Sequence, residues 1–211
     1  MPGPLIVDVT SDIVCPWCFI GKRRLEQAAT ILEREIAIRW HPFELNPGIP
    51  REGMARREYR IAKFGSWEYS RQLDASVAEN GRSAGIEFRH DLMQRTPNSF
   101  RGHVLMAAAL ERDVALQNTV AERLFTGYFC RGEDVGDPAV LASIAHEFGV
   151  DADFDDPALM ERVREEEIGA RDNGVTGVPF IQCQGQLVSE GAAPPEALAA
   201  ALRYVAQNGE G

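Results

Sequence analysis

The chain has 211 residues, 45% of them hydrophobic, and its 22 basic and 32 acidic side chains give a net charge of −10. This balance argues against nucleic acid as a partner, because phosphate binding needs clustered Lys and Arg. No apolar run approaches the ~20 residues needed to cross a bilayer. The opening MPGPLIVDVTSD lacks a basic region, a long apolar stretch and a cleavage site, so we expect a cytoplasmic protein without a membrane partner.

The first fifty residues read as a β-α-β unit. Residues 5–9 (LIVDV) form a short β-branched run typical of a buried strand. Apolar residues at helical spacing then predict a helix that starts at the first two cysteines, and residues 36–40 (IAIRW) predict a second strand. The following HPFELNPGIP is rich in proline and breaks regular structure.

Residues 51–171 have a helical pattern throughout. Two helices are predicted to begin at Asp137-Pro138 and Asp156-Pro157, because each pair combines an N-cap with proline at the first helical position. From residue 179 the pattern returns to strands, with a hairpin around Gln184-Gly185 and a last helix that opens at Pro195.

The order of elements predicts an α/β fold in which β-α-β and β-β-α units share one mixed sheet. We therefore expect a discontinuous domain formed by residues 1–50 and 172–211. A large all-helical insertion domain, residues 51–171, would cover one end of the sheet.

Two cysteines lie at the expected strand-to-helix junction, in the sequence Cys15-Pro16-Trp17-Cys18. The free N–H groups and the dipole of a helix N-terminus favour a thiolate, which is the form that attacks disulfides. We therefore expect Cys15 to be the exposed attacking thiol with a lowered pKa. Cys18 falls one turn later on the apolar stripe, where a sheltered resolving thiol would lie.

The same pair is open to two other interpretations, half of a zinc site or two inert thiols. Zinc usually takes two such pairs, and the remaining cysteines, Cys130 and Cys183, have no Cys or His at a suitable spacing. We expect no metal site and no bridge between Cys130 and Cys183. Cys183 should be buried in a central strand.

Several segments together resemble the thioredoxin superfamily, and within it the FrnE-like branch of the DsbA family of dithiol-disulfide oxidoreductases. The resemblance is carried by DIVCPWCFIGKRRLE, HPFELNPG, REYRIAKFG, TPNSFRGH, LFTGYFCRGEDVGDPAVL and GVTGVPFIQCQGQLVSEGAAPPEAL. It implies a thioredoxin-like fold interrupted by a helical domain, with Cys15 as nucleophile and Cys18 as resolving thiol.

The resemblance also assigns roles outside the cysteine pair. It implies a cis peptide bond between Val178 and Pro179, with the Val178 backbone turned toward the cysteines to dock substrate. It makes Asn98 and His103, in NSFRGH, and Asn46, in FELNP, candidate neighbours of the active site. Asn98 also suits a plain helix N-cap, and the other two suit structural roles.

A related group on the same scaffold offers an alternative function. The 2-hydroxychromene-2-carboxylate isomerases and kappa-class glutathione transferases usually have Ser where Cys15 stands and use glutathione. The resemblance thus implies no bound cofactor, with glutathione as a candidate co-substrate. The partners would be disulfide- or thiol-bearing proteins or small molecules, and the protein would be a monomer or a homodimer.

Overall fold

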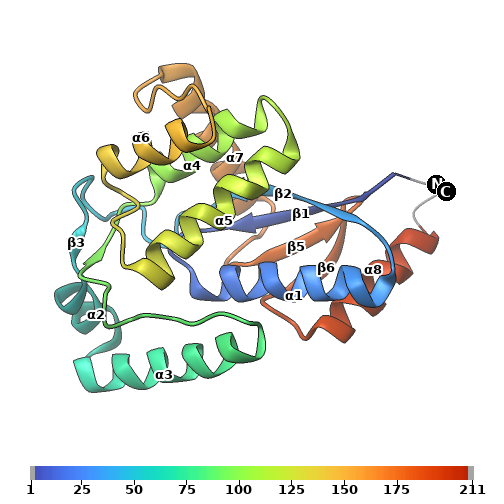
Figure 1. Ribbon diagram of the computed structural model, residues 1–211, viewed down its shortest axis with the longest axis horizontal. Coiled ribbons are helices and arrows are strands. Elements are labelled where there is room, and N and C mark those ends of the chain that lie inside the picture. The colour runs from blue at the N-terminus through green and yellow to red at the C-terminus, as the bar shows by residue number, and fades with distance from the viewer. Residues whose placement is uncertain (1–2, 209–211) are drawn as a thin grey trace.

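A mixed four-stranded sheet forms the centre of the computed structural model, which describes residues 3–208 (Figure 1). Its order is β2-β1-β5-β6, with β1 at Leu5–Ser11, β2 at Ile36–Pro42, β5 at Phe180–Cys183 and β6 at Gln186–Glu190. β1 pairs parallel to β2 and antiparallel to β5, and β6 closes the predicted hairpin. The predicted β-α-β and β-β-α order and the single shared sheet are confirmed.

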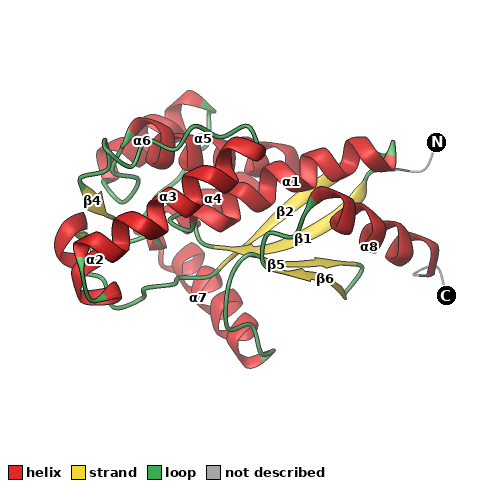
Figure 2. Cartoon of the chain, turned by 90° about the horizontal axis from the view of Figure 1, so that it is seen from below, coloured by secondary structure: helices red, strands yellow, loops and turns green. Residues whose placement is uncertain are grey.

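The central strand β1 carries the chain directly to the cysteine pair. Its inward-facing Val7 and Val9 are buried, as expected for β-branched residues between two partner strands. Four residues separate the end of the strand from helix α1 (Pro16–Leu32). Helix α8 (Pro195–Asn208) packs alongside α1 against the sheet (Figure 2).

Between β2 and β5 the chain is mostly helical. The helices are α2 (Arg56–Phe64), α3 (Trp67–Ser83), α4 (Phe100–Leu110), α5 (Val114–Arg131), α6 (Pro138–Glu147) and α7 (Pro157–Asp172). The predicted caps of α6 and α7 are present, since the Asp137 side chain accepts from the Ala139 N–H and the Asp156 side chain accepts from the Ala158 N–H. The two helices therefore begin where the Asp-Pro pairs indicated.

One short ladder interrupts this helical segment, which the sequence had indicated as wholly helical. Strand β3 (Met54–Ala55) pairs antiparallel with β4 (Arg95–Thr96). Each strand has two residues, too few to produce the alternating pattern by which a strand is recognised in a sequence. The ladder fixes the start of α2 against the chain that leads into α4.

An aromatic cluster joins the helical segment to the sheet. Phe19 of α1 stacks on Phe125 of α5 with ring centroids 5.3 Å apart and contacts Phe88 and Phe129. Gln117 of α5 also exchanges two hydrogen bonds of 2.9 Å with the backbone of Trp40 in β2. These contacts hold the helical segment beside the beginning of α1.

In the part of the chain that the structure describes, no helix combines the length and apolar character needed to cross a bilayer.

Candidate active site

Cys15 occupies the N-cap of α1, as the sequence predicted. Its backbone is extended, with φ −91° and ψ 113°, and Pro16 fills the first helical position. The Cys15 carbonyl accepts from the Cys18 and Phe19 N–H groups at 3.1 and 3.4 Å, which begins the helix. The thiol therefore lies at the positive end of the α1 dipole.

The expectation that Cys15 is exposed is wrong, because only 3% of its surface is accessible. The expectation considered the strand-helix junction alone, whereas in the fold the helical segment and the Val178–Pro179 loop both close over this cysteine. The sulfur is reached through a cavity rather than across an open surface. Cys15 has the predicted position but a different environment.

Cys18 is fully buried one turn further along α1, as predicted. Burial, reinforced by a hydrogen bond with the Cys15 thiol, raises the pKa of the Cys18 thiol well above its usual range. Cys18 therefore stays protonated and inert unless a proton acceptor or a bond to Cys15 changes its state. The pair is asymmetric in the sense expected of an attacking and a resolving thiol.

The loop before β5 faces the cysteines. The Val178–Pro179 peptide bond is cis, as the resemblance implied, and the Cys15 thiol donates to the Val178 carbonyl at 3.6 Å. A Cβ on Gly21 would lie 3.2 Å from Pro179 Cγ, so the small residue in α1 lets the proline approach closely. Backbone of the Val178 segment is thus held next to Cys15.

Asp12 supports the turn that carries Cys15, a role that the sequence analysis did not assign. Its buried carboxylate accepts from the Val14 N–H at 3.2 Å and from the Leu45 N–H at 2.7 Å, while its carbonyl accepts from the Cys15 N–H at 3.0 Å. An aspartate bonding to the backbone two residues ahead is a known turn signal that the sequence already contained.

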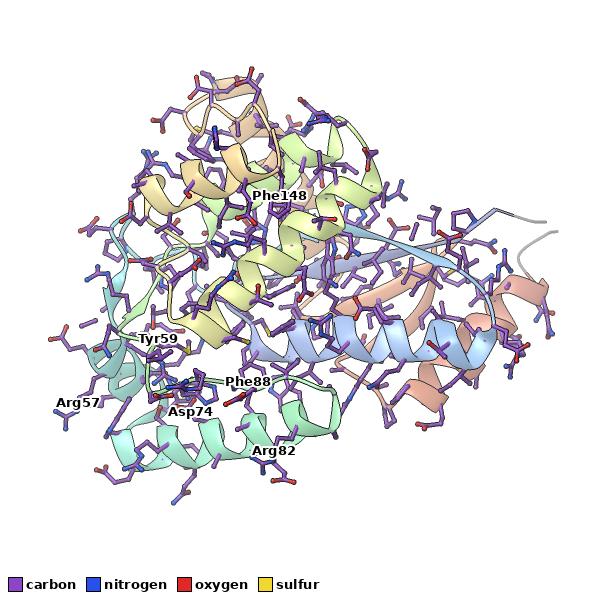
Figure 3. All side chains as sticks on the ribbon, viewed as in Figure 1. Arg57, Tyr59, Asp74, Arg82, Phe88 and Phe148 are labelled. Carbon is purple, nitrogen blue, oxygen red and sulfur yellow. The ribbon has the colours of Figure 1, made fainter. Side chains whose placement is uncertain are left out.

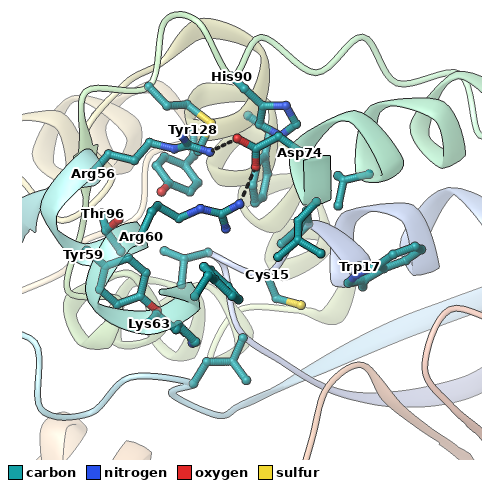
Figure 4. A pocket seen from close by; sticks show the side chains of 18 of the residues that line it. Cys15, Trp17, Arg56, Tyr59, Arg60, Lys63, Asp74, His90, Thr96 and Tyr128 are labelled. Atoms are coloured by element: carbon teal, nitrogen blue, oxygen red, sulfur yellow. Dashed lines mark hydrogen bonds and ion pairs between the residues drawn. The ribbon is translucent and has the colours of Figure 1, made fainter. Parts of the chain in front are cut away.

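Cys15 opens onto a cavity of about 340 Å³ between the start of α1 and helices α2 and α3 (Figure 4). Pro16, Trp17 and Asn46 also line it, so with Cys15 four of the predicted site residues meet there. Trp17 is 36% exposed. The Asn46 side-chain oxygen accepts from the Tyr59 hydroxyl at 2.5 Å and from Lys63 Nζ at 2.7 Å.

The opposite wall of this cavity is cationic, which the sequence analysis missed. Arg56, Arg60 and Lys63 of α2 line it, and Asp74 of α3 accepts from Arg56 at 2.8 Å and from Arg60 at 2.6 Å (Figure 4). The three cations follow one another at helical spacing, i, i+4 and i+7, in RREYRIAK. That spacing was readable from the sequence. What was not readable is that this face would turn toward Cys15.

The other two candidate neighbours, His103 and Asn98, do not line the Cys15 cavity. His103 is buried in α4 with Nε2 3.7 Å from Asp12 Oδ1, so it approaches the cysteine turn only through Asp12. Asn98 lines a separate cavity, where its side chain donates to the Ile49 carbonyl at 2.9 Å and accepts from the Phe100 N–H at 3.1 Å. Its local backbone bonds hold Asn98 at the start of α4, outside the lining of the Cys15 cavity.

Glu44 is a buried acid on the far side of the loop that follows β2. Burial, with the nearby Glu167 and Asp12 carboxylates adding to it, raises the pKa of Glu44 to about 7. Its side-chain Oε1 has no hydrogen-bond partner among the described residues. The residues that follow it, Leu45 and Asn46, line the Cys15 cavity, so this loop separates the two cavities.

The two remaining cysteines lie apart from each other. Cys130 is near the end of α5 and Cys183 is buried in β5, and all four cysteines carry free thiols. Within residues 3–208, no three or more His, Cys, Asp or Glu side chains gather in a way that could hold a metal ion.

Known proteins resemble this chain along most of its length. A crystal structure of a probable DsbA oxidoreductase from Streptomyces coelicolor is 28% identical, with a TM-score of 0.85 over 97% of this chain and 91% of that one. The uncharacterised protein YwbO of Bacillus subtilis is 24% identical over 160 residues, or 76% of this chain and 74% of YwbO.

A structure of a 2-hydroxychromene-2-carboxylate isomerase has a TM-score of 0.70 at 19% identity, over 98% of each chain, which is a likeness of fold. The family model of the DSBA-like thioredoxin domain matches residues 6–203, a stretch that includes the cysteine pair, the helical segment and the Val178–Pro179 loop. The chain therefore belongs to the DSBA-like thioredoxin domain family.

Proposed function

We propose that this protein is a dithiol-disulfide oxidoreductase that acts through Cys15 and Cys18 by way of a mixed disulfide. The observation that carries the proposal is the arrangement of the two thiols. Cys15 lies at a helix N-terminus, faces a cavity and contacts the Val178 carbonyl, while Cys18 lies buried one turn behind it. A cytoplasmic location, where the pair would be kept reduced, is part of the proposal.

The reaction proceeds in two balanced exchanges. The Cys15 thiolate attacks one sulfur of a substrate disulfide, forms a Cys15–substrate bond and releases the other half as a thiolate. The Cys18 thiolate then attacks the Cys15 sulfur, forms the Cys15–Cys18 disulfide and releases the second half. The substrate gains two electrons and two protons in total, and the enzyme pair loses them. A dithiol, or two molecules of a monothiol, reverses both steps, reduces the cysteine pair and is itself oxidised to a disulfide.

The environment of each thiol suits its step. The helix N-terminus favours the thiolate that Cys15 needs for the first attack. Burial and the neighbouring Cys15 thiol raise the pKa of Cys18, so Cys18 stays protonated and is not the thiol that attacks first. The Val178 backbone beside Cys15 offers a carbonyl to the N–H of an extended substrate segment.

A trapping experiment tests this proposal. The Cys18→Ser variant should accumulate a mixed disulfide at Cys15 when it is mixed with an oxidised substrate such as insulin or a small disulfide, read by peptide mass. The Cys15→Ser variant should form none there. If the Cys18→Ser variant collects no adduct at Cys15 with any disulfide, the proposed mechanism is wrong.

The alternative function is a glutathione-dependent isomerase or transferase. It would use one glutathione thiol instead of a cysteine pair, and the enclosed cavity at Cys15 is compatible with a small substrate. Glutathione-dependent isomerisation of 2-hydroxychromene-2-carboxylate separates the two functions. Activity that survives in the Cys18→Ser variant would favour the alternative, since only disulfide exchange needs the second thiol.

A further inference from the structure

We propose that the cationic face of α2, formed by Arg56, Arg60 and Lys63, is an anion subsite that selects small disulfides or thiols carrying a carboxylate. The inference rests on the proposed exchange at Cys15 and names the class of substrate that reaches it. It assigns the choice of substrate to the helical segment, whereas the chemistry belongs to the strand-helix junction.

The size of the cavity favours a small molecule. Its volume of about 340 Å³ lies at the lower end of the range for small-molecule sites. Only 3% of Cys15 is accessible, so a disulfide must place its sulfur inside this cavity to be attacked. Apart from its charged groups the wall is largely apolar, with Leu45, Phe64, Leu73, Val77, Met93 and Phe129 among its residues.

The charge of the cavity favours an anion. Its lining includes three permanent cations and a single carboxylate, Asp74, so two positive charges remain in a chain whose net charge is −10. Burial lowers the pKa of His90, the only histidine in the lining, so this residue is neutral near pH 7 and leaves that excess unchanged. A charge pair in a cleft interacts more strongly than one in bulk water, because the effective dielectric constant is lower.

The cationic side chains of α2 have N–H donors that make no hydrogen bond among the described residues. Arg56 and Arg60 each give one bond to Asp74, and Arg60 gives two more to Ser70. Each guanidinium has five N–H donors in a planar fork that matches a carboxylate. Lys63 donates to the neutral oxygens of Asn46 and Tyr59 and lies over the rings of Tyr59 and Phe64. No carboxylate lies within ion-pair distance of it among the described residues.

The three side chains differ in depth along the helix face. Arg56 is buried, Arg60 is half-buried and Lys63 is exposed, so they lead from the interior of the cavity to its mouth. Arg57, on the same helix, points outward to solvent (Figure 3). This neighbour is a matched control, because it carries the same charge and does not line the cavity.

The test measures the first exchange alone, with the full-length Cys18→Ser chain. Three symmetric disulfides of similar length serve as probes: 3,3′-dithiodipropionate, with two carboxylates; bis(2-hydroxyethyl) disulfide, which is neutral; and cystamine, with two ammonium groups. Each rate of adduct formation at Cys15 is divided by the rate of the same probe with 2-mercaptoethanol, which removes differences in intrinsic reactivity. Peptide mass separates adducts at Cys15 from those at Cys130.

We expect the carboxylate probe to react about ten- to a hundredfold faster than cystamine after this normalisation, as charge-assisted hydrogen bonds imply. Lys63→Gln and Arg60→Gln should each lower the rate with the carboxylate probe about tenfold and change the rate with the neutral probe less than twofold. Arg57→Gln should change no rate more than twofold. If Arg60→Gln fails to fold, Lys63→Gln decides alone, since the Lys63 side chain is exposed.

Three results would overturn the subsite. They are equal normalised rates for the three probes, equal effects of Lys63→Gln and Arg57→Gln, and a protein disulfide with an acidic segment reacting faster than the small carboxylate. Absence of an adduct with every probe is a different outcome, because it removes the proposed exchange at Cys15 itself.

Discussion

The loop that follows β2 has a cationic cluster on one side and an acidic cluster on the other. Toward Cys15, Arg56, Arg60 and Lys63 outnumber the single carboxylate of Asp74. Behind the loop the balance is reversed, with Arg171 and His103 near three carboxylates, those of Asp12, Glu44 and Glu167.

This difference shows how surroundings decide the state of a buried charge. Asp74 is paired with two guanidiniums in the cavity that opens onto Cys15. Among the described residues Glu44 has an unpartnered oxygen, and burial, with two acidic neighbours adding to it, raises the pKa of its carboxyl to about 7. One side is therefore arranged to receive an anion, and the other resists a further negative charge.

The largest effect is expected at the thiol on the cationic side. Cys15 is the one cysteine among the described residues that line the cavity, so in the Cys15→Ser variant the rate of disulfide exchange should fall to that of the uncatalysed reaction. Turnover of insulin disulfides with dithiothreitol measures it. Cys130→Ser is the control and should retain full activity. If Cys130→Ser also abolished turnover, the cavity would not be the only redox centre.

The second-largest effect distinguishes the cationic cluster from the acidic cluster. Neutralising a carboxylate should lower the free energy of unfolding in the first and raise it in the second. Asp74→Asn removes the carboxylate between two largely buried guanidiniums and should lower the free energy of unfolding by roughly 3 kcal/mol. Urea denaturation measures the change. The matched control, Glu79→Gln, breaks an exposed pair with Arg82 and should cost less than about 1 kcal/mol. Similar losses in both variants would contradict the distinction.

On the acidic side, neutralising a carboxylate should stabilise the protein, and the size of this gain should depend on pH. Between pH 4.5 and 7 the folded protein holds a proton on Glu44 that the unfolded chain has released, so stability falls as pH rises through this window. Glu44→Gln removes that loss and should stabilise the protein above pH 7 by roughly 2–3 kcal/mol. Urea denaturation at several pH values measures it, with the exposed Glu165→Gln as control. A destabilised Glu44→Gln at pH 8 would contradict this interpretation.

A smaller effect is expected at the outer edge of the acidic side. Burial of His41 opposes its protonation, but its contacts with Asp8 at 2.8 Å and Glu166 at 3.5 Å outweigh burial and raise the pKa to about 9. The stabilisation is complete below pH 6.5 and is lost as pH rises to 9. His41→Gln should flatten this decline by less than about 1 kcal/mol, because solvent screens the group. An unchanged slope would show that His41 does not titrate in this window.

Local signals in the sequence predicted much of the fold. The β-branched run of β1, the Asp-Pro helix starts and the turn at Gln184-Gly185 each depend on a few neighbouring residues, and the structure contains all three elements. The burial of Cys18 followed from its place on the apolar stripe of α1. The cis bond before Pro179 followed from the family resemblance rather than from any local pattern.

The site was less predictable because its environment comes from distant segments. The burial of Cys15 depends on helices that begin about forty residues later, and the Asp74–Arg60 pair joins two different helices. No spacing rule brings such groups together. The basic spacing on α2 was visible, yet a charged helix face is ordinarily solvated, so only the packing could reveal that it faces a cavity.

The position of the cationic face within the chain has a consequence for protein engineering. The proposed exchange uses residues 12–18, whereas the proposed anion subsite lies on one nine-residue helix that ends at Phe64. Redox potential is set largely at the cysteine pair and the residues between them. Charge reversal at positions 60 and 63 would thus offer a route to retargeting the proposed exchange toward cationic disulfides while the redox potential of the cysteine pair stays the same.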